Sequence, residues 1–204
     1  MYSHLPINVL IAGVGGQGNL IVSRLLAAVA MKNRVGVVIG ETKGASQRGG
    51  PVTSHIRFSQ HPLGPLIPHK MAHIIIGFEP LETLRASRRY SNEETTVLFN
   101  PAPVVPMLVA QGLQQYPKLE DISLELGSMN QCVHLIEATQ LASKAGDPIL
   151  LNVVMLGALC GLSLLSFERE QFVETIVNGV PEKYRELNRL AFEAGYEQGC
   201  ARMP

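Results

Sequence analysis

The sequence predicts a three-layer α/β domain built around a mainly parallel sheet. Short apolar runs alternate along the chain with longer segments whose apolar residues recur at helical spacing, which is the pattern of strands joined by crossover helices. A glycine-rich turn separates the first apolar run from the first helical segment, as in Rossmann-like folds. The 204 residues are 46% hydrophobic and 17% charged, which allows a substantial core, and we expect a single domain over residues 1–204.

The first elements are expected in regular alternation. Residues 7–12 are apolar and predict a strand, and residues 18–32 carry leucine, valine and alanine at helical spacing and predict a helix. Residues 35–39 are rich in valine and isoleucine and predict a second parallel strand, which ends near Glu41.

Residues 52–58 have a different pattern. Their apolar and polar side chains alternate with a period of two, which is typical of a half-exposed strand. Residues 61–68 then hold three prolines and one glycine. We therefore expect a β-hairpin excursion near residues 52–68 rather than another core element.

The rest of the chain returns to the alternation. Apolar runs predict strands at 73–78, 95–99 and 122–126. Helical spacing predicts helices at 81–90, 105–115, 137–145, 149–164, 167–178 and 182–198. Ser166 is expected to cap the helix that begins at residue 167.

The charge balance and the apolar segments exclude several classes of partner. Seventeen basic and seventeen acidic residues cancel, and the sequence has no long basic stripe, so we expect no nucleic-acid partner. The longest apolar stretch, residues 149–165, contains Asn152, Ser163 and two glycines, which favours a buried helix over a membrane span. The N-terminus lacks the charged region of a signal peptide.

The cysteines point to a reducing compartment. Cys132, Cys160 and Cys200 are scattered and odd in number, and no C-x-x-C motif occurs. The chain alone can therefore build neither a zinc ribbon nor an iron–sulfur cluster. Free thiols of this kind are typical of a cytoplasmic protein.

The turn after the first strand is the strongest candidate for a binding site. Gly13, Gly15 and Gly18 satisfy the pattern G-x-G-x-x-G between a strand and a helix, where helix N–H groups can face a phosphate. Glu41 follows Gly18 by 23 residues, which is close to the position of a ribose-binding acid. One reading is therefore a free-standing NAD- or FAD-dependent oxidoreductase. Gly16-Gln17 is an unusual filling of this motif, and a turn that only packs strand against helix is the alternative.

A second glycine-rich segment, with a single arginine, follows some thirty residues later. Arg48 lies just before Gly49 and Gly50, and its guanidinium could grip a carboxylate or phosphate in a planar, bidentate way. His55 and Arg57 share one face of the following strand and could extend an anion-binding surface beside the first turn. The alternative is an exposed loop before a solvated strand face, which we favour for Arg57 taken alone.

Other candidate residues carry weaker signals. His69 and His73 are four apart, but Pro68 and the strand expected at 73 place them in different directions, so no metal site is predicted. His134 follows Cys132 by two residues, which we interpret as incidental. Asn152 is either a satisfied core amide or a group that faces a ligand.

Four segments of the chain together resemble a known family. The stretches VLIAGVGGQGNLIVSRLLAAVA, GETKGASQRGGPVTSHIRFS, IIIGFEPLETLR and VLFN are similar to the γ-type domain of 2-oxoacid:ferredoxin oxidoreductases. The likeness is greatest to the small (β) subunit of indolepyruvate:ferredoxin oxidoreductase. It runs from about residue 7 to the end and is densest up to Asn100. His73 stands where the family commonly has aspartate, which leaves the role of that position open.

The resemblance implies an activity shared with a larger subunit. Such enzymes decarboxylate an aryl-2-oxoacid oxidatively with coenzyme A and pass two electrons to ferredoxin. Thiamine diphosphate, magnesium and the iron–sulfur clusters would belong to the large (α) subunit and none of them to this chain alone. The isolated chain would then be inactive and could form a homodimer. A non-catalytic assembly module is a further alternative.

The resemblance also implies which residues face the shared site, where coenzyme A or the substrate carboxylate would bind. Two loops would line it, and Arg48 is the best candidate for a catalytic role. The loops consist of Gly13, Gly15, Gly16, Gln17 and Gly18, and of Ser46, Gln47, Arg48, Gly49 and Gly50.

Overall fold

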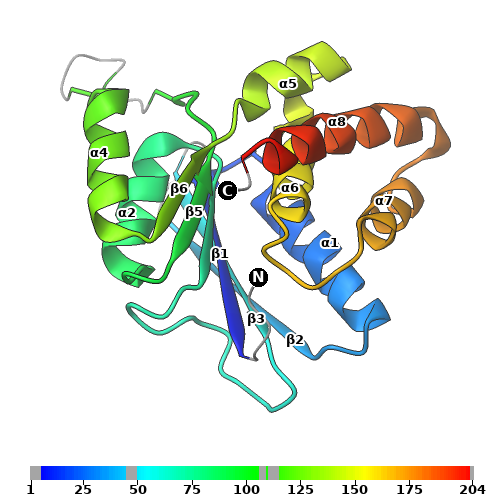
Figure 1. Cartoon of the computed structure of the whole chain (residues 1–204), viewed down its shortest axis with the longest axis horizontal. Coiled ribbons are helices and arrows are strands. Elements are labelled where there is room, and N and C mark those ends of the chain that lie inside the picture. The colour runs from blue at the N-terminus through cyan, green and yellow to red at the C-terminus, as the bar shows by residue number, and fades with distance from the viewer. Residues whose placement is uncertain (1–5, 45–49, 106–108, 110–114, 203–204) are drawn as a thin grey trace.

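The computed structural model describes residues 6–44, 50–105, 109 and 115–202. Its centre is a six-stranded sheet with helices on both faces (Figure 1). The strands are β1 (Ile7–Val14), β2 (Val37–Lys43), β3 (Pro51–Phe58), β4 (Ile74–Gly77), β5 (Thr96–Phe99) and β6 (Cys132–Leu135). The helices are α1 (Asn19–Lys32), α2 (Pro80–Tyr90), α4 (Leu119–Met129), α5 (Ala138–Ala145), α6 (Leu151–Gly161), α7 (Arg169–Asn178) and α8 (Glu182–Cys200), with a short 3₁₀ helix, η1 (Pro148–Leu150).

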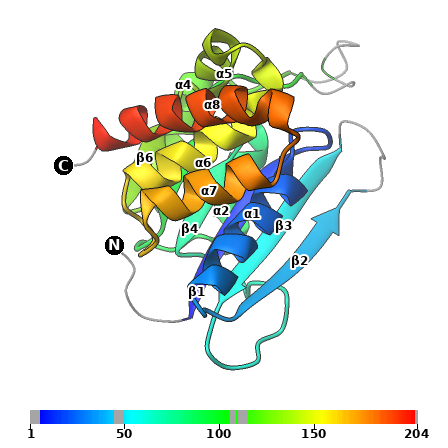
Figure 2. The same cartoon turned by 90° about the vertical axis from the view of Figure 1, so that its right-hand side faces the viewer.

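The sheet has the order β2-β3-β1-β4-β5-β6. β1, β4, β5 and β6 pair in parallel, whereas β3 pairs antiparallel with both β1 and β2. Helices α2 and α4 lie on one face of the sheet, and α1, α6, α7 and α8 on the other (Figures 1 and 2). This confirms the Rossmann-like α/β fold class and the mainly parallel sheet.

The hairpin lies at a different place from the one expected. It consists of β2 and β3, and both strands belong to the main sheet. Residues 59–73, all of them described, contain no strand. The strand expected at 35–39 begins at Val37, runs on to Lys43 and is separated from β1 by β3. The pairing of β3 with β1 depends on contacts that are distant in sequence, which local alternation does not reveal.

The prediction that β3 is half-exposed was wrong, because both of its faces are covered. Ile56 and Phe58 pack into the core on the α1 side. On the opposite face, residues 59–72 cover the polar side chains. The backbone N–H of Ile67 donates to His55 Nδ1 at 3.2 Å, and Arg57 donates to the carbonyl of Gly64 at 2.9 Å.

Two further elements differ from the prediction. The strand expected at 122–126 is part of helix α4, in which Ile122 and Leu126 lie four residues apart and are both fully buried. The sixth strand is β6 instead, four residues that had no predicted element. The helix expected at 105–115 falls largely outside the described residues.

The last helices are close to their predicted bounds. Helix α7 begins at Arg169, two residues later than expected, because Glu168 and Gln171 form a reciprocal capping box there. Ser166 is therefore not its cap. Within the described ranges, no helix combines the length and the hydropathy that a membrane span needs.

Helices α6 and α8 approach each other unusually closely. A Cβ atom on Gly157 of α6 would lie 2.1 Å from the carbonyl oxygen of Phe192, and one on Gly195 of α8 would lie 1.9 Å from that of Val154. Gly161 and Gly199 repeat the arrangement one turn further on. The backbones of the two helices are thus in direct contact, which any side chain at these positions would prevent.

Candidate functional site

The candidate site lies beside β1, at the switch point of the sheet. The chain adds β3 and β2 on one side of β1, and β4, β5 and β6 on the other. Helices α1 and α2 follow β1 and β4, which are neighbours in the sheet, and cover opposite faces (Figure 1). In open α/β sheets, ligands bind beyond the carboxyl ends of the strands at such a point. The glycine turn of residues 13–18 lies at this edge, and Glu79 begins helix α2 beside it.

The glycine turn presents the N-terminus of α1 without a side-chain cap. Gly18 is the N-cap residue with a φ of 87°, no side chain accepts from the first helical N–H groups, and the first turn contains no acidic residue. A Cβ on Gly18 would also lie 2.2 Å from Asn152 Nδ2, so only glycine fits there. Gly16 is exposed with a φ of 103°. The positive end of the helix dipole is therefore open to an anion.

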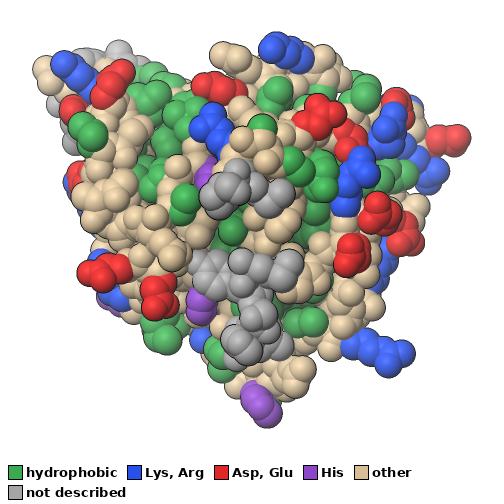
Figure 3. All heavy atoms as spheres, in the orientation of Figure 1, with side chains coloured by type: hydrophobic (Ala, Val, Ile, Leu, Met, Phe, Trp, Pro, Cys, Tyr) green, Lys and Arg blue, Asp and Glu red, His purple; other side chains and the backbone are tan. Residues whose placement is uncertain are grey.

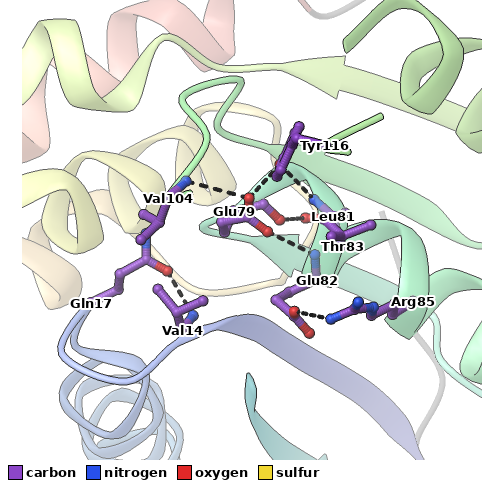
Figure 4. A network of polar contacts seen from close by, with 9 residues as sticks. All are labelled: Val14, Gln17, Glu79, Leu81, Glu82, Thr83, Arg85, Val104 and Tyr116. Carbon is purple, nitrogen blue, oxygen red and sulfur yellow. Dashed lines mark hydrogen bonds and ion pairs between the residues drawn. The ribbon is translucent and has the colours of Figure 1, made fainter. Parts of the chain in front are cut away.

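Gln17 holds the turn in place through both ends of its side-chain amide. Its Oε1 accepts from the backbone N–H of Val14 at 2.8 Å (Figure 4). Its Nε2 donates to the carbonyl of Phe78 at 3.1 Å. Asn100 Nδ2 donates to the same Phe78 carbonyl at 3.2 Å. The ends of β1, β4 and β5 are thus joined through one oxygen. The unusual amide in the motif fixes the shape of the turn, and its own polar groups are engaged within the protein.

Glu79 is a buried carboxylate that the sequence analysis did not single out. Its Oε2 accepts from the backbone N–H of Glu82 at 2.8 Å and caps α2. Its Oε1 accepts from the hydroxyl of Tyr116 and from the backbone N–H of Val104 (Figure 4). Burial, together with the hydrogen bond to Glu79, raises the pKa of the Tyr116 phenol, which stays a neutral donor. Glu79 therefore ties Val104 and Tyr116 to the start of α2.

A local signal for this role is present in the sequence. Pro80 at the first helical position, with Glu79 before it and Glu82 three residues after Glu79, marks the start of a helix. The signal identifies Glu79 as a cap, but the contacts with Val104 and Tyr116 depend on the tertiary fold.

A groove of about 410 Å³ lies beside the glycine turn. Glu41 of β2 and the turn line the same groove, so the structure brings these two predicted features together. The full lining consists of Val14, Gly15, Gly16, Gly18, Asn19, Leu20, Ile21, Glu41 and Val52. In contrast with a dinucleotide fold, β3 separates the strand that carries Glu41 from β1.

The second glycine-rich segment is described only at its end. Ser46, Gln47, Arg48 and Gly49 lie outside the described residues. Gly50 is buried, and its carbonyl accepts from the backbone N–H of Gly15 at 3.0 Å. The two predicted loops therefore meet at Gly15 and Gly50.

His55 and Arg57 do not belong to this site, which corrects the anion-binding surface expected there. They lie opposite Leu10 and Asn8 in the register of β3 with β1, toward the end of β1 that is remote from the turn. Arg57 is buried and donates from Nε to Asn8 Oδ1 at 2.9 Å. Its guanidinium anchors the covering loop instead of a ligand.

His69 and His73 bind different partners. His69 Nε2 accepts from Arg89 Nε at 3.0 Å, and His73 Nδ1 accepts from the backbone N–H of Asn8 at 3.0 Å. Among the described residues, no group of three or more histidine, cysteine, aspartate or glutamate side chains is arranged to hold a metal.

An apolar cavity of about 460 Å³ adjoins the groove on the α1 side. Ile21 lines both hollows, and Asn152 of the cavity lining packs against Gly18 of the groove. Ile21, Ile149 and Tyr184 line this cavity and are 55%, 65% and 45% exposed.

On the face of the molecule shown in Figure 3, acidic and basic side chains are interspersed and form no basic stripe.

Comparisons with known proteins agree with this architecture. Residues 8–198 match the family model described as pyruvate ferredoxin/flavodoxin oxidoreductase. The chain is 36% identical over 200 residues to the indolepyruvate oxidoreductase subunit IorB of Archaeoglobus fulgidus, a match that covers 98% of both chains. It is 37% identical over 189 residues to the subunit of the same name from Pyrococcus horikoshii, with 92% of this chain and 93% of that one covered.

Two solved structures share the fold. One is the gamma subunit of a keto/oxoacid ferredoxin oxidoreductase from Geobacter sulfurreducens, with a TM-score of 0.70, 20% identity, and 96% of this chain and 99% of that chain covered. The other is a 2-oxoglutarate:ferredoxin oxidoreductase from Magnetococcus marinus, with a TM-score of 0.75, 18% identity, and 98% of this chain against 32% of that chain. The chain belongs to the pyruvate ferredoxin/flavodoxin oxidoreductase family, in which it is similar along nearly its whole length to a subunit of indolepyruvate oxidoreductases.

Proposed function

We propose that this chain, acting as one domain, is the small subunit of an indolepyruvate:ferredoxin oxidoreductase. The enzyme would decarboxylate an aryl-2-oxoacid oxidatively with coenzyme A and pass electrons to ferredoxin through its large subunit. The observation that carries the proposal is the uncapped N-terminus of α1 at the switch point of the sheet, in a chain so similar to such subunits. In this proposal thiamine diphosphate, magnesium and the iron–sulfur clusters are held by the larger (α) subunit.

The role proposed for the glycine turn is to bind and orient an anionic group of coenzyme A or of the substrate. Backbone N–H groups and the helix dipole at Gly18 favour a phosphate or carboxylate. Gln17 keeps the turn in its shape before the ligand arrives, which lowers the entropic cost of binding. Glu41 in the same groove would accept from a ligand hydroxyl and repel a second anion.

The apolar rim at Ile21, Ile149 and Tyr184 supports assembly with a larger partner. Large apolar side chains that gather around one hollow are typical of surfaces that another protein covers. The cavity also adjoins the groove at the glycine turn. A partner seated there would close the site from one side, so the isolated chain is expected to show no turnover.

The first test is an anaerobic pull-down of the tagged chain from its native host, with iron, sulfide and thiamine analysis of the eluate. Co-purification of a larger subunit that carries these cofactors would support the proposal. A chain that purifies alone and without cofactors would contradict it.

A second test addresses Arg48 in the assembled complex. Arg48→Ala is expected to raise the KM for coenzyme A or the 2-oxoacid while the complex stays assembled. Arg24→Ala, at an exposed position of α1, is the matched control and should leave the kinetics unchanged. Unchanged kinetics in Arg48→Ala would remove this residue from the site and favour a pure assembly module.

A free-standing NAD- or FAD-dependent oxidoreductase is the second candidate, because Glu41 and the glycine turn line one groove. The insertion of β3 between β1 and β2 counts against it. Titration of the purified chain with NADH and FAD separates the two proposals. Saturable dinucleotide binding that weakens in Glu41→Gln would support the second candidate, and absence of binding would exclude it.

A further inference from the structure

A cysteine and a histidine form a close pair at the edge of the sheet. Strand β6 is the last strand in the sheet order, and Cys132 and His134, two residues apart, point to the same face. Cys132 Sγ lies 3.2 Å from His134 Nε2. The cysteine is exposed, whereas the imidazole is only 8% exposed. An accessible sulfur therefore has a buried, positioned nitrogen beside it.

The surroundings of His134 keep the imidazole neutral. Burial, and after it the positive charge of Arg202 at the end of α8, lowers the pKa of His134 below 6.5. A neutral imidazole whose other nitrogen carries the hydrogen can accept the thiol proton at Nε2. The hydrogen bond therefore places a neutral base in direct contact with the accessible sulfur of Cys132.

We propose that Cys132 is a modification site, a reactive thiol that exchanges with low-molecular-weight disulfides. As Sγ of Cys132 attacks one sulfur of the disulfide, His134 takes the thiol proton. A new S–S bond joins Cys132 to one half of the reagent, and the other half leaves as a thiolate, which receives the proton. The cysteine sulfur is oxidised and the disulfide is reduced in the same step, so no other oxidant is needed.

This site is separate from the glycine turn. Cys132 begins β6, whereas the turn follows the carboxyl end of β1, and the two strands run in the same direction. The sulfur of Cys132 therefore lies at the amino-terminal end of its strand, whereas the groove lies at the carboxyl end of β1. The inference does not depend on the proposed function.

The other two cysteines provide an internal comparison. Burial raises the pKa of Cys160 to about 12, so that it forms almost no thiolate near neutral pH. Cys200 is partly buried at the end of α8 and is hydrogen-bonded to Tyr196. Within the described part of the chain, no imidazole is hydrogen-bonded to the sulfur of either one.

The experiment measures mixed-disulfide formation on the full-length chain with glutathione disulfide at pH 7.5. Samples are quenched with acid at intervals, and peptide mass spectrometry gives the rate at each cysteine. We expect Cys132 to react at least about tenfold faster than Cys160 and Cys200. His134→Asn should slow the reaction at Cys132 by a similar factor, whereas His61→Asn, at an exposed position, should not change it.

Two results would overturn the proposal. The first is that Cys132 in the unmodified chain reacts no faster than Cys200, and this comparison needs no variant. The rate could also stay the same in His134→Asn, which would mean that exposure alone determines it. Because His134 is buried, circular dichroism must show that His134→Asn keeps the fold, and the comparison of Cys132 with Cys200 in the unmodified chain tests the proposal independently of that variant.

Discussion

His55 should make the stability of this protein depend on pH in the range between neutral and mildly acidic. The side chain is fully buried under residues 59–72, and its ring meets that of Tyr90 edge-on with centroids 5.2 Å apart. Burial first, then the charges of Arg89 and Arg57, lowers the pKa of His55 from 6.5 to about 4. Protonation would also turn the acceptor for the backbone N–H of Ile67 into a donor.

The sign of the effect follows from the lowered pKa. Between pH 6.5 and about 4 the unfolded chain binds a proton that the folded chain does not, so the free energy of unfolding falls as the pH falls through this window. The two pKa values give a loss of about 2 kcal/mol between pH 7.5 and pH 5. Burial also lowers the pKa of His73 and of His134, and these contributions have the same sign.

The assay is urea unfolding followed by circular dichroism at pH 7.5, 6.5, 5.5 and 5.0. His55→Asn keeps an acceptor oxygen near the position of Nδ1 but does not titrate in this range, and His61→Asn removes an exposed histidine as the control. We expect the loss between pH 7.5 and pH 5 to be about 2 kcal/mol smaller in His55→Asn than in the unmodified chain, with the control unchanged. If His55→Asn loses stability as steeply as the unmodified chain, His55 is not the group responsible.

Four other substitutions test the packing, the turn and the cap of α2. Gly157→Ala should lower the free energy of unfolding by about 1–3 kcal/mol, because the new Cβ meets the backbone of α8. Gly127→Ala is the control, at an exposed position of α4 with open space around it, and should raise the free energy of unfolding by about 0.5–1 kcal/mol. Thermal unfolding of the two variants compares them. Gln17→Met removes two hydrogen bonds and should cost about 1–2 kcal/mol in urea unfolding, and no loss would mean that the turn holds its shape without them. Glu79→Ala should lower the pKa of the Tyr116 phenol, which ultraviolet titration measures, and an unchanged titration would contradict the contact. The same substitution removes the cap of α2 and should lower the free energy of unfolding by about 1 kcal/mol.

The parts of the fold that were predictable rest on local patterns. The apolar run of β1, the glycines after it and the spacing in α1 lie within some thirty residues, so the strand, the turn and the helix could all be inferred from neighbouring positions. The capping signature at Glu79 is equally local. In α4, the spacing of Ile122 and Leu126 is helical, and the prediction of a strand there misread its period.

The parts that were missed depend on contacts between distant segments. Nothing near residues 51–58 indicates that β3 inserts between β1 and β2, because this pairing is decided by the sheet as a whole. The anchoring of Arg57 by Asn8 and Gly64 is likewise visible only in three dimensions. Within the site, the sequence predicted the turn and the nearness of Glu41, but not that both ends of the Gln17 amide are used inside the protein.

The contact between α6 and α8 has a mechanical consequence for the apolar cavity. The four glycines let the two helices share one backbone surface, so the pair cannot slide without a collision and cannot spread without losing its backbone contacts. Asn152 and Val153 of α6 and Leu187 of α8 line the cavity and therefore form a stiff part of its wall, whereas α1, η1 and α7 supply other lining residues, among them Ile21, Ile149 and Ile176. Widening of the cavity must then come from displacement of α1, η1 or α7, and selection for a larger or smaller occupant would act on the residues of these elements and leave the glycine-packed pair unchanged.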